Sequence, residues 1–300
     1  MRIVILGATG MLGHKLWQRL SGRFADVHAV IRRPRADPIN HGLFLDRPVV
    51  DGVDVSDFSA LRKVLERLRP NVVINCVGVT KRREAATDPV PSIALNGLLP
   101  HQLALWGQAR QCRLIHFSTD CVFNGNAGGY TEDSLTDAED LYGRTKALGE
   151  TAAPNALTLR SSFIGRELAN GTELLEWFLA QRGRTIRGFR EALYTGVSSI
   201  YLADLVAEIL VRNPEISGLY NLASEVVSKY DLLCLAREKF GVEVKIEPDD
   251  AYVCKRDLNG SLLTSKLGCR PPPWARMMAD LAADPTLYQQ WRSQDAALGA

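Results

Sequence analysis

Residues 2–13 of the chain read RIVILGATGMLG, an apolar run followed at once by three glycines at intervals of three residues. Such a run is typical of a strand that is buried on both faces of a parallel sheet. Gly7, Gly10 and Gly13 permit a tight turn and let the backbone approach a ligand closely, and residues 11–20 have the apolar spacing of a helix. Strand, glycine turn and helix in this order predict a dinucleotide-binding fold, with an ordinary glycine turn as the alternative.

The same alternation of strand and helix continues along the chain. Apolar runs predict strands at 27–31, 72–76, 114–118, 156–160 and 219–222, and helical spacing predicts helices at 58–68, 174–181, 200–211, 230–240 and 274–281. Asp57 or Ser56 can cap the helix that ends before Pro70. We therefore predict an α/β fold with a doubly wound, Rossmann-like parallel sheet. Residues 1–155 should form the cofactor-binding core, and 156–300 mainly a smaller substrate-binding lobe, with some segments returning to the core.

Composition narrows the functional classes. The 300 residues are 46% apolar and 23% charged, with a net charge of +2, which gives no reason to expect a nucleic-acid or membrane partner. No apolar run approaches the roughly 18 residues of a membrane span. The six cysteines are scattered without a C-x-x-C pair, so neither a disulfide framework nor a metal site is predicted. We expect a cytoplasmic protein that is a monomer or homodimer.

The end of the second predicted strand indicates which dinucleotide binds. An NAD site usually has an acidic residue about 20 residues beyond the glycines. Here the sequence runs VHAVIRRP, which places Arg32 and Arg33 at that position. Two guanidinium groups suit the 2′-phosphate of NADP, and a solvated surface pair is the alternative. The sequence thus predicts that NADPH is preferred over NADH.

Further residues are candidates for the cofactor site. Asp54 can accept a hydrogen bond from the adenine amino group or instead cap a helix, and Gly78 can let the backbone lie against the adenosine ribose or simply begin a loop. The predicted cofactor-binding residues are Gly7, Thr9, Gly10, Met11, Leu12, Gly13, Arg32, Arg33, Asp54, Val55, Cys76, Val77, Gly78, Asn96, Ser118, Tyr142 and Lys146.

A second group of residues indicates proton chemistry. In LYGRTKALGE, Tyr142 and Lys146 are four residues apart and would share one face of a helix. The lysine cation is expected to lower the tyrosine pKa from its ordinary value of about 10, so that the phenol can donate a proton to a carbonyl near neutral pH. Ser118 and Thr119 end a predicted strand and can bind the same carbonyl. Asn96 is either a proton relay to the lysine or a polar residue satisfied within its helix.

Together, the motifs GATGMLG, STDCVF and YGRTKALGE resemble the extended short-chain dehydrogenase/reductases, and more narrowly the dTDP-4-dehydrorhamnose reductase group. The later stretch CKRDLNGSLL is similar to that group as well. The resemblance implies hydride transfer from NADPH to C4 of a nucleotide-linked 4-keto-6-deoxy sugar, in deoxysugar or polysaccharide precursor synthesis. It also implies a catalytic triad of Thr119, Tyr142 and Lys146.

Some positions depart from the pattern of this group. Cys121 stands where a tyrosine is usual, Phe163 stands where a tryptophan often lines the sugar site, and residues 81–83 (Lys81, Arg82, Arg83) replace an acidic pair. The sugar therefore stays open, and a UDP- or GDP-linked, even N-acetylated, deoxy sugar is an alternative. An epimerase and a non-catalytic, nucleotide-binding regulatory subunit on the same fold are further alternatives. The predicted substrate-binding residues are Thr80, Thr119, Asp120, Cys121, Phe163 and Arg187.

The second half also contains a basic cluster, QRGRTIRGFR, with Arg182, Arg184, Arg187 and Arg190. One or two of these arginines can clamp the substrate's diphosphate, and a solvated loop is the alternative. Trp177 and Trp274 are expected to pack in the core or between helices and not to stack on a base.

Overall fold

Seven parallel strands form the central sheet of the computed structural model, which describes residues 1–37, 40, 42–45, 47–80, 87–169 and 171–288. The strands are β1 (Arg2–Leu6), β2 (Asp26–Val30), β3 (Val49–Val50), β4 (Val72–Asn75), β5 (Arg113–Ser118), β6 (Ala156–Arg160) and β11 (Gly218–Asn221). Their order is β11-β6-β5-β4-β1-β2-β3, so the chain reverses direction across the sheet between β1 and β4. The predicted α/β fold with a Rossmann-like parallel sheet is confirmed. Ligands of such sheets bind beyond the carboxyl ends of the strands, at this reversal.

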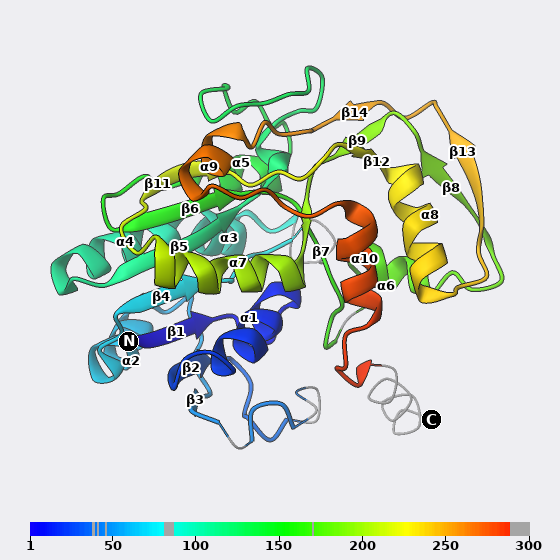
Figure 1. The fold of residues 1–300 in the computed structure, drawn as a ribbon. Helices are drawn as coiled ribbons and strands as arrows, with labels where there is room; N and C mark the ends of the chain where they lie inside the picture. Colours follow the sequence, from blue (N-terminus) through cyan, green and yellow to red (C-terminus); the bar gives the residue numbers. More distant parts are fainter. Residues whose placement is uncertain (38–39, 41, 46, 81–86, 170, 289–300) are drawn as a thin grey trace.

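Helices cover both faces of the sheet (Figure 1). Ile3 and Ile5 of β1 belong to a core shared with α1 (Met11–Ser21) and α7 (Ser199–Arg212). Val4 and Leu6 belong to a second core, with α2 (Phe58–Leu68) and α4 (Leu99–Arg110). Because successive side chains of a strand point to opposite faces, one apolar run supplies both cores. This explains why the predicted strands are apolar at nearly every position.

The helix α2 (Phe58–Leu68) begins and ends where its capping residues predict. Asp57, one of the two candidate caps, accepts a 3.0 Å hydrogen bond from the amide of Ala60 and begins α2. Arg69 ends this helix in the left-handed conformation, just before Pro70. The stretch expected to form one helix around Asn96 starts as α3 (Pro89–Ser92), widens into the π-helix η3 (Ile93–Leu98) and continues as α4. A π-helical turn of this kind occurs frequently at functional sites.

Most of the other elements form a smaller lobe beside the sheet, on the right of Figure 1. Its strands are β7 (Phe163–Ile164), β8 (Thr185–Phe189), β9 (Ala192–Tyr194), β10 (Val197–Ser198), β12 (Val227–Ser228), β13 (Lys245–Asp249) and β14 (Cys254–Lys255). Its helices are α6 (Leu174–Leu179), α8 (Lys229–Phe240) and α10 (Trp274–Ala282). These strands are not predicted by the sequence pattern, because runs of two to five residues with mixed polarity show no clear periodicity.

The remaining helices are α5 (Leu141–Leu148), the 3-10 turn η4 (Asp120–Val122) and α9 (Ser261–Leu267), which packs beside β11. β6, α7 and β11 belong to the large sheet and its helical cover, although they follow residue 155. Within the described part of the chain, no helix has the length and apolar character needed to cross a membrane.

Candidate active site

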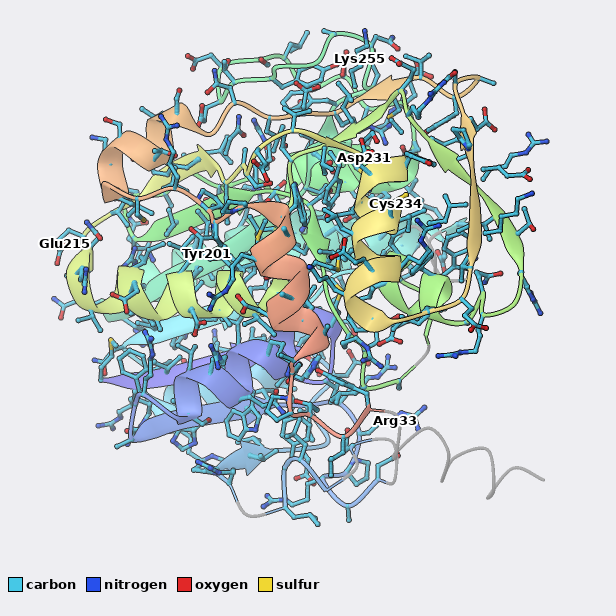
Figure 2. The ribbon with its side chains drawn as sticks, turned by 45° about the vertical axis from the view of Figure 1, so that its right-hand side comes forward. Arg33, Tyr201, Glu215, Asp231, Cys234 and Lys255 are labelled. Carbon is cyan, nitrogen blue, oxygen red and sulfur yellow. The ribbon has the colours of Figure 1, made fainter. Side chains whose placement is uncertain are left out.

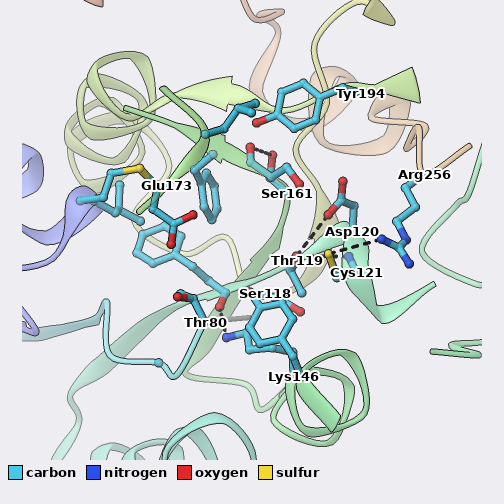
Figure 3. Close-up of a pocket in the computed structure, with 18 of the residues that line it drawn as sticks. Thr80, Ser118, Thr119, Asp120, Cys121, Lys146, Ser161, Glu173, Tyr194 and Arg256 are labelled. Carbon is cyan, nitrogen blue, oxygen red and sulfur yellow. Dashed lines mark hydrogen bonds between the residues drawn. The ribbon is translucent and has the colours of Figure 1, made fainter. Parts of the chain in front are cut away.

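A cavity of about 750 Å³ lies beyond the carboxyl ends of the central strands (Figure 3). One wall comes from the glycine turn, a second from the segments that follow β4, β5 and β6, and a third from the smaller lobe. The predicted substrate-binding residues all line it: Thr80, Thr119, Asp120, Cys121, Phe163 and Arg187. Predicted cofactor residues that line it are Gly10, Met11, Leu12, Cys76, Val77, Gly78, Ser118, Tyr142 and Lys146.

The glycine turn forms a cradle that side chains would fill. Gly7 has φ +73°, and a Cβ on Gly13 would lie 2.1 Å from the carbonyl oxygen of Gly7. Gly10 is the N-cap of α1, so the first amide groups of this eleven-residue helix face the cavity that Gly10 and Met11 line. A helix N-terminus offers unpaired amide donors and the positive end of the helix dipole. The turn therefore fits the pyrophosphate of a dinucleotide.

The candidate residues for adenosine recognition lie at the protein surface. Arg33 follows β2 (Figure 2), is 57% exposed in its side chain, and forms a 3.1 Å ion pair with Asp37. Arg32 is also exposed. Asp54 accepts hydrogen bonds from the amide (2.9 Å) and hydroxyl (2.7 Å) of Ser56, and these bonds lower its pKa. Asp54 does not have the alternative role of capping α2, because the N-cap of this helix is Asp57.

Thr119, Tyr142 and Lys146 all line the cavity, as Figure 3 shows for Thr119 and Lys146. Thr119 follows β5, and its hydroxyl oxygen accepts a 3.2 Å hydrogen bond from the amide of Cys121. Tyr142 and Lys146 lie on α5, whose N-cap Asp140 accepts a 2.9 Å bond from the amide of Gly143. A helical turn thus presents the tyrosine and the lysine on one face, as the spacing predicted.

The expected effect of the lysine on the tyrosine is wrong. Burial raises the pKa of Tyr142; the nearby Cys121 acts in the same direction, and a hydrogen bond with Thr119 acts in the opposite one. Lys146 is itself only 6% exposed, and loss of hydration lowers its pKa to about 8. Its ammonium group donates a 2.6 Å hydrogen bond to the carbonyl of Phe117. Tyr142 therefore keeps its proton at neutral pH, the protonation state that a proton donor needs, but as a weaker acid than the spacing predicted.

The hydroxyl of Ser118 is directed to Glu150. It donates a 2.6 Å hydrogen bond to Glu150, whose carboxylate also receives two bonds, of 2.8 and 2.7 Å, from Arg160. The predicted bond from Ser118 to a substrate carbonyl is not what this geometry favours, because its proton is directed to Glu150. Glu150 in turn partly offsets the effect of burial on the pKa of Lys146.

Asn96 ties the π-helix to the cavity wall. Its amide donates to the carbonyl of Val79 (3.0 Å) and accepts from the Val79 amide (2.9 Å), and it also donates to the hydroxyl of Thr145 (3.2 Å). Asn96 is fully buried, so these bonds satisfy a group that would otherwise be costly to bury. The proton relay to Lys146 stays a prediction.

The remaining predicted cofactor residues, Gly7, Thr9, Gly13 and Val55, are not among those that line the cavity. Gly7, Thr9 and Gly13 belong to the same glycine turn, and Val55 follows the short strand β3. Lys81, Arg82 and Arg83 lie outside the described residues.

Several lining residues were not anticipated by sequence reasoning: Ser161, Glu173, Tyr194, Lys229, Tyr252 and Arg256. Arg256 donates to the carbonyl of Phe123 (2.8 Å) and contacts the sulfur of Cys121 at 3.8 Å (Figure 3). The one sequence signal that pointed to Arg256 was that its segment, CKRDLNGSLL, is similar to a stretch of the reductase group. Tyr194 and Glu173 come from short elements of the lobe that carry no motif.

The two tryptophans and the basic cluster differ in which of their residues reach the cavity. Trp274 is buried as expected, but Trp177 is 36% exposed and lines the cavity, because α6 turns Leu175 and Phe178 to the core instead. Among the four clustered arginines, only Arg187 lines the cavity within the described chain. It also forms a 3.4 Å ion pair with Asp249.

Comparison with known proteins agrees with this geometry. Residues 1–283 match the model of the family described as "RmlD substrate binding domain". Over 170 residues, the chain is 38% identical to a Streptomyces antibioticus protein named "Probable dTDP-4,6-dihydroxy-2-methyloxan-3-one 4-ketoreductase", covering 55% of this chain and 52% of the relative. The chain thus spans about half the length of the streptomycete relatives it matches.

A longer but weaker match is to methionine adenosyltransferase 2 subunit beta from Rattus norvegicus, 24% identical over 89% of this chain and 81% of that protein. The crystal structure of a dTDP-4-dehydrorhamnose reductase from Bacillus anthracis, in complex with NADP, superimposes with a TM-score of 0.77. The two are 18% identical, over 94% of this chain and 99% of that one. At this identity, the likeness establishes the shared fold.

Proposed function

The chain belongs to the family of the RmlD substrate binding domain, and from this premise we propose that it reduces the C4 keto group of a nucleotide-linked 4-keto-6-deoxy sugar with NADPH. The observation that carries the proposal is the presence of Thr119, Tyr142 and Lys146 in one cavity with the glycine turn. The name of the streptomycete relative, a 4-ketoreductase, supports the reaction type. We further propose that residues 1–155 bind the cofactor and that 156–300 mainly form the substrate side.

Each catalytic side chain has a distinct task in this proposal. When bound, the nicotinamide supplies the hydride for C4. Tyr142, which burial keeps protonated, donates its proton to the carbonyl oxygen. The hydroxyl of Thr119 shares the negative charge that develops on this oxygen. Lys146, which is held by its hydrogen bond to the Phe117 carbonyl, adds a positive charge to the cavity that Thr119 and Tyr142 also line.

We propose that different parts of the core bind the pyrophosphate and the 2′-phosphate of the cofactor. The amides at the start of α1, near Gly10 and Met11, would receive the pyrophosphate. Arg32 and Arg33 would receive the 2′-phosphate and thereby favour NADPH over NADH. The ion pair of Arg33 with Asp37 is exposed, so exchanging it for a phosphate contact costs little.

The substrate would occupy the cavity between the triad and the smaller lobe. Arg187 is the candidate for the diphosphate, since it reaches the cavity from β8. Cys121, Arg256 and Phe163 would form the wall next to the sugar. Phe163 is fixed by an edge-to-face contact with Phe117, with 5.9 Å between ring centroids. Because Cys121 and Phe163 depart from the pattern of the dTDP-4-dehydrorhamnose reductases, the proposal does not specify the base or the sugar.

The direct test is a substrate panel. The purified chain would be incubated with NADPH and with dTDP-, UDP- or GDP-linked 4-keto-6-deoxy sugars, while absorbance at 340 nm is followed. We expect one NADPH to be consumed for each C4 alcohol formed, with at least one sugar nucleotide, and little turnover by Tyr142→Phe. Conversion of the sugar without net NADPH consumption would identify an epimerase instead.

A second candidate function is that of a nucleotide-binding regulatory subunit, which the match to methionine adenosyltransferase 2 subunit beta over 89% of the chain favours. Such a subunit needs the fold but not the triad. In that case the chain would bind NADPH but leave every sugar nucleotide of the panel unreduced. Turnover that is lost in Tyr142→Phe would exclude this reading.

A further inference from the structure

The segment of residues 284–288, here termed the C-terminal clasp, is docked on α1 directly behind the glycine turn. Its Asp284 forms a 2.5 Å ion pair with Lys15, and the two side chains are only 4% and 3% exposed. Thr286 of the clasp accepts a 2.8 Å hydrogen bond from the same lysine. Ionised groups are almost never buried this completely unless they are paired, so the contact fixes the clasp in one position.

A second contact connects the clasp to the glycine turn itself. Nδ1 of His14 lies 2.9 Å from the carbonyl oxygen of Gly10, and Nε2 lies 2.6 Å from the hydroxyl of Tyr288. A carbonyl can only accept, so Nδ1 carries the proton, and Nε2 of the neutral ring is an acceptor for Tyr288. The phenol lies closer to this nitrogen than to its other acceptor, Oδ2 of Asp284 at 3.2 Å. Burial lowers the pKa of His14 to about 4, in accord with a neutral ring. The phenol of Tyr288 thus orients the imidazole that holds Gly10.

Tyr288 also contacts the smaller lobe. The guanidinium carbon of Arg166 lies 4.6 Å from the centre of its ring, and Nε of Arg166 donates a 2.6 Å hydrogen bond to Glu176 of α6. The same carboxylate oxygen of Glu176 accepts from the amide of Glu167 at 3.1 Å. Glu167 lines the cavity. A continuous set of contacts therefore runs from the glycine turn, through Tyr288, to the substrate side.

We propose that the C-terminal clasp preorganises the cofactor turn, with Tyr288 as a positioning residue that holds His14 on Gly10 and the start of α1 against the smaller lobe. Glycine backbones lose more freedom on ordering than any others. A turn that is already ordered binds its ligand more tightly, because less freedom is lost on binding. The clasp lies just beyond residues 1–283, the part that matches the family model. Its effect on NADPH rests on the proposed function.

The test uses Tyr288→Phe, which removes the hydroxyl and keeps the ring, in the full chain. We expect the dissociation constant for NADPH, measured directly by nucleotide fluorescence, to rise about three- to tenfold, the effect of one lost hydrogen bond. In the cofactor-free protein, backbone amides of residues 7–16 should exchange hydrogen for deuterium faster than in the wild type. Thr286→Val, which removes a bond to Lys15 from the same segment, should act in the same direction.

The matched control is Tyr220→Phe, a partly buried tyrosine on the edge strand β11. It should leave both measurements unchanged. If Tyr288→Phe lowers only the melting temperature, and leaves the NADPH affinity within twofold and the exchange of residues 7–16 unaltered, the clasp is a purely structural contact and the inference is wrong. If the wild type binds no NADPH, the proposed function fails, and exchange in the cofactor-free chain still decides for or against the clasp.

Discussion

The ammonium group of Lys146 donates a 2.6 Å hydrogen bond to the carbonyl oxygen of Phe117, so that α5 is anchored to the end of β5 beside Thr119. This bond holds a cation in a nearly closed environment, where its pKa falls to about 8. The charge of this lysine is therefore sensitive to mild alkali, unlike that of an exposed lysine with a pKa of about 10.4.

We predict that kcat/KM falls as the pH rises through about 8, because Lys146 loses its cation. The free energy of unfolding should change in the opposite direction and increase over this pH range. The unfolded chain keeps that lysine protonated up to about pH 10.4, so it binds more protons than the folded chain between these values, and the free energy of unfolding rises with pH there. Lys146→Met should remove this contribution to the pH dependence of stability. A pH–rate profile and urea unfolding across pH 7–10 check both; a rate that stays flat to pH 10 would contradict the assignment.

Tyr142→Phe should lower kcat by about 10² or more, since the phenol is the proposed proton donor to the C4 oxygen. The dissociation constant for NADPH should change little, because the proton is needed only in the chemical step. Steady-state rates at saturating substrate, together with direct cofactor binding, make this measurement. Activity equal to that of the wild type would refute the role of the tyrosine.

Arg187→Ala should raise the KM for the sugar nucleotide about tenfold, the cost of one charge-assisted contact, and leave the KM for NADPH unchanged. Arg182→Ala is the matched control, since Arg182 belongs to the same basic stretch but does not line the cavity. Similar effects of the two substitutions on both KM values would argue that the stretch acts only through its general charge.

Arg32→Ala should raise the KM for NADPH about tenfold while the KM for NADH stays constant, because only NADPH carries the 2′-phosphate. Arg23→Ala serves as a control, since Arg23 lies beyond the distal end of α1 and pairs with Glu208. The two cofactors are compared at fixed sugar-nucleotide concentration. A parallel rise for NADH would place Arg32 outside the phosphate site.

Asp284→Asn should lower the free energy of unfolding by about 3–5 kcal/mol, because it leaves the buried Lys15 without a counter-charge. Lys15→Met combined with Asp284→Leu should cost much less than the sum of the single changes. Urea unfolding followed by circular dichroism provides the comparison. Additive effects would show that the two side chains do not depend on each other.

Sequence reasoning predicted the features that depend on local pattern. The helix 58–68 was predicted at the bounds it has in the structure. The central strands other than the short edge strand β3, which was not predicted, were placed within about one residue, because buried parallel strands are apolar throughout. Fixed spacing likewise placed Tyr142 and Lys146 on one helical face. These signals need no knowledge of distant segments.

What sequence reasoning missed depends on contacts between distant parts of the chain. The pKa of Tyr142 follows from burial by the surrounding walls, which spacing alone does not reveal. Arg256 approaches Cys121 across 135 residues, and Trp177 lines the cavity because its neighbours Leu175 and Phe178 face the core. Such arrangements are decided by how the lobe packs on the sheet.

The ion pair of Lys15 with Asp284 also bears on where this protein can be shortened. The match to the family model ends at residue 283, which would make that position an obvious place to shorten the chain for expression. A chain cut there would lose Asp284, Thr286 and Tyr288, so that Lys15 and His14 would lose the partners they have in the complete clasp. We would expect such a fragment to be recovered mainly as aggregate, although each residue recognised by the family would still be present.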